Sequence, residues 1–249
     1  MLRWKNKIAV VTGANQGIGY GIAKELVKHG IKVVSLDIET SNVEDLSDEH
    51  KYNGLIVSKK VDVREEQEVV DAFQWIKKHI GPVSILINSA GVLETTNLSD
   101  GNADIWKNTL LTNVHGLNLC TREAVRCLKQ NGDEGHIIHL NSICGHFVPQ
   151  IENFNVYPAS KYAVTALTEG LRRELAKLKA NIKVSSISPG IVKTKMLEVK
   201  LKTDPMYKNI PFLPLLEVDD VVESVIYVLG TPPNIQVHEL IIKPLHEFV

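Results

Sequence analysis

The chain has 249 residues and a formal net charge of −1 at pH 7, with 44% hydrophobic and 23% charged residues. This length and balance are typical of one globular domain, and they exclude a disordered or fibrous chain. Because the charge is close to zero and no long basic run occurs, nothing favours binding to nucleic acid or to an anionic membrane.

Two further features indicate the compartment. No stretch approaches the roughly 18 apolar residues of a membrane span, and the polar residues before Ile8 do not fit a signal peptide. Cys120, Cys127 and Cys144 lack the paired spacing of a zinc site, so we expect free thiols and no bound metal. The sequence therefore predicts a soluble, cytoplasmic protein.

Short β-branched runs alternate with longer amphipathic runs along the whole chain. The predicted strands are Ile8–Val11, Lys32–Leu36, Leu55–Val61, Ser84–Ile87, His136–Asn141, Lys183–Ile187 and Glu239–Ile242. The predicted helices are Gly17–His29, Glu65–His79, Ala103–Lys129, Pro158–Lys179 and Asp219–Leu229. Because the strands are apolar on both faces, we expect a single-domain, Rossmann-like α/β fold over residues 1–249, with a doubly wound parallel sheet and helices on both faces.

The first chemical motif follows the first predicted strand and opens the first predicted helix. The glycines of Thr12-Gly13-Ala14-Asn15-Gln16-Gly17-Ile18-Gly19 allow a tight turn and let the backbone approach a pyrophosphate at the helix N-terminus. The alternative is a glycine-rich turn without a ligand. Since a strand precedes the motif and a helix follows it, we interpret it as a dinucleotide site. The predicted cofactor contacts here are Gly13, Asn15, Gln16, Gly17, Ile18 and Gly19.

Asp37 closes the second predicted strand. An acidic side chain at this place can accept hydrogen bonds from the adenosine ribose hydroxyls, and it repels a 2′-phosphate. No Arg or Lys occupies positions Asn15, Gln16, Ile38 or Glu39 to attract such a phosphate. Asp37 therefore predicts NAD in preference to NADP, with a solvated aspartate at a strand end as the alternative.

Two more strand ends fit the same cofactor. Asp62 and Val63 follow the third predicted strand and can flank adenine. Asn88, Ala90 and Gly91 follow the fourth predicted strand, where small residues permit close backbone approach. Each of these signals is weak when taken alone.

The catalytic motif is Tyr157-Pro158-Ala159-Ser160-Lys161. A phenol has an unperturbed pKa of about 10, which is too high for an efficient base at neutral pH. Lys161 lies four residues on and on the same helical face, where its ammonium favours the phenolate. Pro158 suits the first turn of a helix, so we expect Tyr157 near the positive helix end, which favours the phenolate as well.

Two polar residues complete the candidate site. Ser142 stands at the end of the preceding predicted strand and can hold the substrate oxygen beside the phenol. Asn113 falls inside a long predicted helix, where asparagine is disfavoured. That position suggests a local use, such as holding a water in a proton path, and the alternative is a capping or solvent-facing side chain.

Taken in order, Thr12–Gly19, Asn88–Gly91, Asn113, Ser142, Tyr157, Lys161 and Pro189-Gly190 resemble the short-chain dehydrogenase/reductase family over essentially the whole chain. The whole set of motifs in this order is specific for that family, although each motif alone is not. The resemblance implies a catalytic tetrad of Asn113, Ser142, Tyr157 and Lys161, in which Tyr157 exchanges the substrate proton while nicotinamide exchanges the hydride. It also implies cofactor contacts from Tyr157, Lys161, Pro189, Gly190, Val192 and Thr194.

The segments Cys120–Ala124, Lys161–Arg172 and Val225–Leu229 resemble insect farnesol dehydrogenases and related vertebrate hydroxysteroid dehydrogenases. That group generally acts on lipophilic alcohols and ketones, and many members prefer NADP, from whose basic pattern Asp37 departs. The resemblance implies an NAD(P)-dependent oxidoreductase for a small lipophilic alcohol or carbonyl substrate, such as a farnesol-like isoprenoid or a steroid. The alternative is a non-catalytic NAD-binding regulatory or scaffold protein of the same fold, which would not need the tetrad.

Two expectations concern surfaces. The segment 195–217 is apolar for a surface connection and follows a strand on the ligand side of the sheet, so we expect it to cover the substrate. Packing of a short helix on the core or on a partner subunit is an open alternative. The resemblance also implies a homodimer or homotetramer, paired through the helices near 103–129 and 158–179. The apolar positions expected to support that pairing are Val114, Leu117, Val164 and Leu167.

Overall fold

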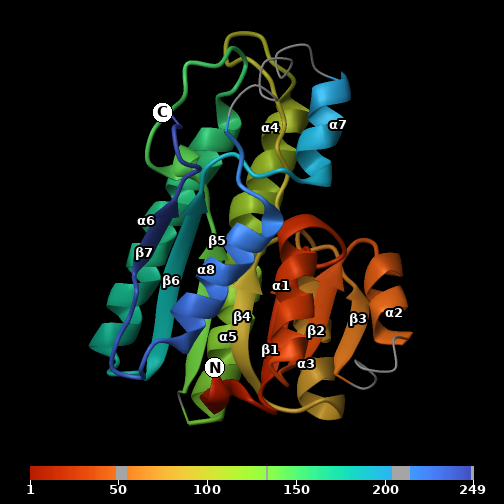
Figure 1. The fold of residues 1–249 in the computed structure, drawn as a ribbon, viewed down its shortest axis with the longest axis vertical. Coiled ribbons are helices and arrows are strands. Elements are labelled where there is room, and N and C mark those ends of the chain that lie inside the picture. The colour runs from red at the N-terminus through yellow and green to blue at the C-terminus, as the bar shows by residue number, and fades with distance from the viewer. Residues whose placement is uncertain (49–54, 133, 204–213, 248–249) are drawn as a thin grey trace.

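Seven parallel strands form one sheet, in the order β3-β2-β1-β4-β5-β6-β7 (Figure 1). The computed structural model describes residues 1–48, 55–132, 134–203 and 214–247. The strands are β1 (Ile8–Thr12), β2 (Lys32–Asp37), β3 (Ile56–Lys60), β4 (Val83–Asn88), β5 (Gly135–Leu140), β6 (Ile182–Pro189) and β7 (Glu239–Ile242). The predicted doubly wound parallel sheet and all seven predicted strands are confirmed, with ends that agree to within two residues.

Helices cover both faces of the sheet. One face packs against α1 (Gly17–Lys28), α2 (Ser41–Asp48) and α8 (Val218–Gly230), and Figure 1 shows α1 and α8 in front of the strands. The other face packs against α3 (Glu66–His79), α5 (Leu117–Gln130) and α6 (Val156–Lys177). In β1 the side chains alternate: Ala9 and Val11 enter the first cluster, Ile8 and Val10 the second. Because both faces of the sheet are covered there, β1 is buried at every position and apolar up to its last residue, Thr12.

The strand order reverses between β1 and β4. β1 pairs with β2 on one side and with β4 on the other, and Thr12 at the end of β1 lies opposite Asn88 at the end of β4. In open α/β sheets the crevice beyond the carboxyl ends of the strands at such a reversal is the usual ligand site. The glycine turn and the Asn88–Gly91 turn both begin at this point.

The predicted helix Ala103–Lys129 is interrupted by a wider turn. The helix α4 (Ala103–Leu110) runs into a π-helical stretch, Leu111–Gly116, before α5 begins. Gly116 lies so close to Val63 that a Cβ atom on it would be 2.8 Å from a Val63 methyl carbon. Pattern analysis does not distinguish a π turn from an α turn, because the apolar spacing on either side is helical.

Two helices were not predicted. In α2 only Val43 and Leu46 are buried apolar residues, too few for a clear helical pattern. The helix α7 (Lys195–Thr203) occupies the first part of the proposed substrate cover, with Leu197 buried and Met196 and Val199 exposed. Residues 204–213 of that cover, with Met206, Tyr207, Ile210, Phe212 and Leu213, lie outside the described residues.

Two of the four positions expected to support subunit pairing, Leu117 and Val164, were predicted wrongly. Leu117 and Val164 are 7% and 0% exposed within the single chain, so they belong to its own core and are not surplus apolar positions. Val114 and Leu167 are half-buried and remain candidates for an interface.

Three observations bear on the expected compartment and metal content. Within the described ranges, no helix combines the length and hydrophobicity that a membrane crossing requires. Among the same residues, no three His, Cys, Asp or Glu side chains gather in a way that could hold a metal ion. Cys120, Cys127 and Cys144 are buried free thiols.

Candidate active site

The glycine turn is packed against the turn that follows β4. Gly13 has a φ of +65°, and a Cβ atom on it would lie 2.7 Å from the Cα of Ala90. A Cβ atom on Gly19 would collide with the carbonyl oxygen of Gly13. The Thr12 hydroxyl accepts the backbone N–H groups of Ser89 (3.1 Å) and Ala90 (3.0 Å). Two strand ends are therefore held together with backbone exposed between them.

The N-terminus of α1 opens from this turn and fits an anion. The helix begins at Gly17, its first turn contains no acidic residue, and the side chain of Gln16 at the N-cap makes no capping hydrogen bond. The first N–H groups of a helix lack partners within the helix and attract phosphate. This cradle matches the pyrophosphate of a dinucleotide. Ile18 is half-buried against the core, and Gln16 is exposed.

Asp37 ends β2 beside the same turn. One carboxylate oxygen accepts the backbone N–H of Asn15 at 2.9 Å, and the other accepts that of Glu39 at 3.2 Å. Asn15 is 4% exposed, and its side chain and carbonyl accept hydrogen bonds from Asn42 on α2. Each Asp37 oxygen has a further lone pair for a ribose hydroxyl.

The two remaining adenine-side candidates are held by neighbours. The Asp62 carboxylate accepts hydrogen bonds from the guanidinium of Arg64, and these bonds lower the pKa of Asp62. Val63 is 7% exposed and packs against Gly116. Asp62 therefore stays ionised, with its charge already paired.

Tyr157 and Lys161 share the first turns of α6, as predicted. Tyr157 is the second residue of the helix, and the Nζ atom of Lys161 lies 5.7 Å from the centre of its ring. Lys161 is 7% exposed and its Nζ donates to the carbonyl of Leu140 at 2.9 Å. Burial lowers the pKa of Lys161 to about 8. A buried cation beside the phenol and the positive end of α6 both favour the phenolate.

Ser142 follows β5 and is 8% exposed. Its hydroxyl oxygen accepts the backbone N–H of Cys144 at 3.1 Å, which caps the short 3₁₀ turn Ile143–Gly145. That bond uses an oxygen lone pair and leaves the hydroxyl proton to donate. Ser142 can therefore donate to a substrate oxygen.

Asn113 lies in the π-helical stretch and is 2% exposed. Its side-chain oxygen accepts the N–H of Val92 (2.8 Å), and its amide nitrogen donates to the Val92 carbonyl (2.9 Å) and to the Ser160 hydroxyl (3.0 Å). Ser160 in turn donates to the Tyr157 carbonyl at 2.7 Å. These bonds use both protons of the side-chain amide and one lone pair of its oxygen. Asn113 thus connects the turn after β4 to the first turn of α6, and the idea of a solvent-facing or capping side chain is wrong.

The match to a known family agrees with this arrangement. Residues 7–205 match the sequence model described as short chain dehydrogenase. The chain belongs to the short-chain dehydrogenase family. It is therefore an oxidoreductase by family, as the resemblance implied.

Relatives of this short-chain dehydrogenase share its full length. It is 43% identical over 250 residues to a farnesol dehydrogenase of Aedes aegypti, with 99% of each chain covered. It is 40% identical to dehydrogenase/reductase SDR family member 11 of Mus musculus, covering 99% of this chain and 97% of that one. A serine dehydrogenase structure complexed with NADP⁺ superposes with a TM-score of 0.87 at 25% identity, covering 97% and 96% of the two chains.

In this short-chain dehydrogenase an apolar wall stands beside Tyr157. Ile143, Cys144 and Phe154 form a small buried cluster separate from the two main cores. The half-buried side chains packed against it are Leu93, Phe147, Ile151 and Tyr157. The rings of Phe154 and Tyr157 are 5.3 Å apart. This wall was not predicted from the sequence, because its members come from three separate parts of the chain.

The segment Pro189–Thr194 follows β6 and is held on two sides. Gly190 donates its N–H to the carbonyl of Ile242 at 2.8 Å, and Val192 forms a β-bridge with Leu216. Thr194 lies near the glycine turn, since a Cβ atom on Gly17 would be 3.8 Å from its side chain. The two segments expected to contact the cofactor, Pro189–Thr194 and the glycine turn, therefore lie close together beyond the carboxyl ends of the strands.

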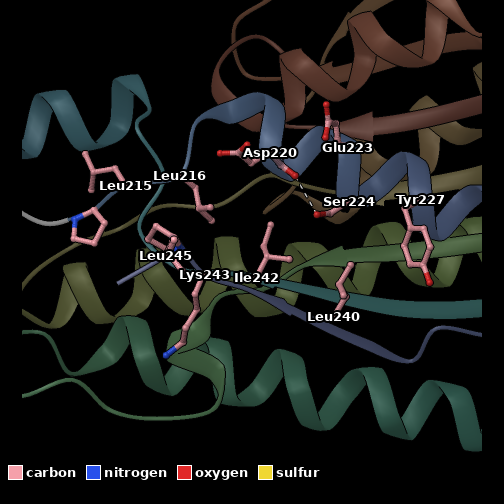
Figure 2. Close-up of a pocket in the computed structure, with 12 residues that line it drawn as sticks. Leu215, Leu216, Asp220, Glu223, Ser224, Tyr227, Leu240, Ile242, Lys243 and Leu245 are labelled. Atoms are coloured by element: carbon pink, nitrogen blue, oxygen red, sulfur yellow. Dashed lines mark hydrogen bonds between the residues drawn. The ribbon is translucent and has the colours of Figure 1, made fainter. Parts of the chain in front are cut away.

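Figure 2 shows a different hollow of this short-chain dehydrogenase, an open groove of about 760 Å³ between α8 and the C-terminal strand. Its lining includes Leu215, Tyr227, Leu240 and Leu245, and none of the four tetrad residues. The groove therefore lies apart from the predicted catalytic residues, although Leu216 and Ile242 on its wall also hold Pro189–Thr194.

Proposed function

We propose that this protein oxidises a small lipophilic alcohol to its ketone or aldehyde with NAD, using Tyr157 as the acid/base. The observation that carries this proposal is the buried Lys161 ammonium, 5.7 Å from the ring centre of Tyr157 at the N-terminus of α6. A regulatory or scaffold protein that only binds NAD would have no use for a buried cation beside a phenol, since burying an ammonium is costly.

The protein's part in the reaction is proton transfer and orientation. Ser142 donates its hydroxyl proton in a hydrogen bond to the substrate oxygen and holds it beside the phenol. Tyr157 as phenolate accepts the hydroxyl proton of the alcohol, while Lys161 stabilises the phenolate charge. A bound nicotinamide dinucleotide supplies the acceptor for the hydride. Asn113 keeps the first turn of α6 at a fixed distance from the turn after β4, through Ser160 and Val92.

The preferred dinucleotide in this proposal is NAD. Asp37 stands at the end of β2 with both oxygens oriented by backbone N–H groups, and its charge disfavours a 2′-phosphate. The serine dehydrogenase of similar fold was solved with NADP⁺. Because a protein of this fold can bind NADP⁺, the proposed preference for NAD rests on Asp37 and not on the fold.

The proposed substrate is a farnesol-like isoprenoid, with a steroid alcohol as the second candidate. The apolar wall of Phe147, Ile151 and Phe154 beside Tyr157 suits a hydrocarbon chain. The relative at 43% identity is a farnesol dehydrogenase. The exposed Met196 and Val199 on α7 are further apolar groups on the segment expected to cover the substrate.

A panel assay with a tyrosine variant tests this function. Purified protein is offered farnesol, short-chain alcohols and hydroxysteroids with NAD and with NADP, and NADH or NADPH formation is followed. We expect turnover of farnesol with NAD, and a fall of about 10²- to 10⁴-fold in Tyr157→Phe, which lacks only the hydroxyl. Dinucleotide binding should persist in that variant. Binding of NAD without turnover of any substrate would instead favour the regulatory protein.

We also propose that the protein is cytoplasmic and acts as a homodimer or homotetramer. Half-buried Val114 and Leu167 lie on the two helices expected to pair. Tyr227 and Leu245, 63% and 80% exposed, line the groove of Figure 2 and offer a second apolar surface. Light scattering at micromolar concentration tests the assembly, and a monomer mass would refute it.

A further inference from the structure

A row of polar contacts joins the end of β5 to the catalytic helix α6. Lys161, Thr165 and Thr168 follow one another at i, i+4 and i+7, so they lie on one face of the helix. Lys161 Nζ donates to the Leu140 carbonyl (2.9 Å), Thr165 accepts the side-chain amide of Asn141 (2.9 Å), and Thr168 bonds His139 (2.9 Å). His139, Leu140 and Asn141, at the end of β5, are thus bonded to three positions on one face of α6.

His139 occupies a special place in this row because both of its ring nitrogens are bonded. The side chain is 1% exposed. Its Nδ1 lies 2.9 Å from the Thr168 hydroxyl on α6, and its Nε2 lies 3.3 Å from the Thr121 hydroxyl on α5. Thr121 also accepts the side-chain amide of Asn88, at 2.9 Å. His139 therefore stands between the catalytic helix and the strand end of the cofactor crevice.

The partners of Thr168 determine where the imidazole proton lies. Thr168 donates its single hydroxyl proton to the Val164 carbonyl at 2.7 Å, so it can only accept at His139. Nδ1 must then carry a proton. Burial, helped by the charge of Lys161, lowers the pKa of His139 to about 4, so the ring is neutral and Nε2 accepts the Thr121 proton.

The bonds form one directed chain across four elements. It runs from the Asn88 amide on β4 through Thr121 on α5 and His139 on β5 to Thr168 and the Val164 carbonyl on α6. Apolar packing is not directional, whereas a satisfied buried hydrogen-bond chain permits one arrangement. Such a chain therefore resists displacement of α6 along its own axis, at a point two turns beyond the Lys161–Leu140 bond.

We infer that His139 is a positioning residue which, as a neutral imidazole with its proton on Nδ1, holds α6 at the height that places Lys161 beside Tyr157. This inference rests on the proposed function, since it assumes that Tyr157 and Lys161 catalyse. Thr168 lies two helical turns from Lys161, so a shift of the helix at Thr168 is transmitted to the ammonium.

Three substitutions separate the two arms of His139. His139→Leu removes both bonds while keeping an apolar side chain of similar size. His139→Asn retains an amide donor near the position of Nδ1 and therefore the arm to Thr168. His139→Gln reaches the position of Nε2 and retains only the arm to Thr121. The matched control is His136→Leu, because His136 is also on β5 and 0% exposed but bonds Ser185 on β6 instead of α6.

The first measurement is hydrogen exchange of the α6 amides between residues 161 and 168, which requires no turnover. We expect exchange in the Leu and Gln variants of His139 to be about tenfold faster or more, with the Asn variant close to wild type. His136→Leu should loosen β5 and β6 without this local effect on α6. Equal exchange of α6 in His139→Leu and His136→Leu would overturn the inference. If His139→Leu does not fold, the Asn and Gln variants still decide, because equal behaviour of these two would overturn it as well.

The second measurement is the pH profile of kcat. In the Gln and Leu variants of His139 we expect kcat to fall about 10- to 100-fold and its acid limb to move to higher pH, since Lys161 no longer stabilises the phenolate. The Asn variant should keep the wild-type limb, and so should His136→Leu. A lower kcat with an unchanged acid limb in all variants would contradict the positioning role of His139. If the wild type itself shows no turnover, the proposed function fails, while the exchange data still test His139.

Discussion

The two sides of the proposed catalytic crevice are assembled by different means. On the cofactor side, β1, α1 and β4 approach so closely that backbone meets backbone, as the contacts of Gly13 with Ala90 and of Gly19 with Gly13 illustrate. On the catalytic side, β5 and α6 are joined by side-chain hydrogen bonds from His139, Asn141 and Lys161. The cofactor side is therefore sensitive to any added atom, whereas the catalytic side is sensitive to any lost donor or acceptor.

The largest expected effect is on the catalytic side. Lys161→Met keeps the length of the side chain and removes its charge and the bond to Leu140. Because burial lowers the pKa of Lys161 to about 8, the wild-type lysine is charged below that pH and favours the phenolate there. We expect kcat for alcohol oxidation at pH 7 to fall about a thousandfold. The acid limb of its pH profile should move upward, towards the pKa of about 10 of an isolated phenol.

Stopped-flow measurement of NADH formation between pH 6 and pH 10 checks this prediction. Arg173→Met is the matched control, since Arg173 lies on the same helix, 75% exposed at its side chain, and only pairs with Glu169. Arg173→Met should retain the wild-type kcat and the wild-type acid limb of the pH profile. A Lys161→Met enzyme with the wild-type pH profile would show that the charge has no part in activating Tyr157.

A smaller effect is expected from an added methyl group on the cofactor side. In Gly19→Ala the new Cβ atom would collide with the Gly13 carbonyl, so the turn must open. We expect NAD affinity, measured by calorimetry, to fall about a hundredfold, and the free energy of unfolding to fall by roughly 2 kcal/mol.

Gly170→Ala on α6 is the matched control for Gly19→Ala. Apart from its chain neighbours and the nearby backbone of α6, no heavy atom of the described residues lies within 4 Å of the Cβ position of Gly170, and its φ is not in the left-handed region. We expect unchanged NAD affinity and a gain of about 0.5–1 kcal/mol in the free energy of unfolding. Equal losses in both glycine variants would mean that close backbone contact is not what distinguishes the cofactor side.

An effect of about tenfold is expected on the choice of dinucleotide. Asp37→Asn removes the charge but keeps an oxygen that can accept the Asn15 N–H, whereas Asp37→Ala removes both. In each variant the ratio of kcat/KM for NAD to that for NADP should fall roughly tenfold, which corresponds to ~1.4 kcal/mol. Only Asp37→Ala should also lose thermal stability. A wild type that uses NADP as well as NAD would contradict the assigned role of Asp37.

The cofactor side was the easier of the two to predict from the sequence. Gly13, Gly17 and Gly19 stand within seven residues of one another, so their function appears as a local motif. Asp37 closes β2 as predicted, because a run of β-branched residues defines that strand. Tyr157 and Lys161 were also predictable, since their spacing of four residues places them on one helix face.

The supports of the catalytic side could not be predicted in the same way. His139 meets Thr121 and Thr168 across 18 and 29 residues, and such pairs have no spacing rule. Asn113 was selected because it is a poor helix former, but its partners Val92 and Ser160 appear only when the chain is folded. A side chain that bonds distant backbone has no local sequence signature.

The π-helical stretch Leu111–Gly116 has a consequence for the length of this region. Deleting one residue there would leave a segment that still forms a regular α-helix, so no helical propensity would be lost. The wider turn itself would be lost, and with it the local backbone that presents the amide of Asn113 to Val92 and Ser160. The number of residues in this turn is therefore as much a part of the site as their identity.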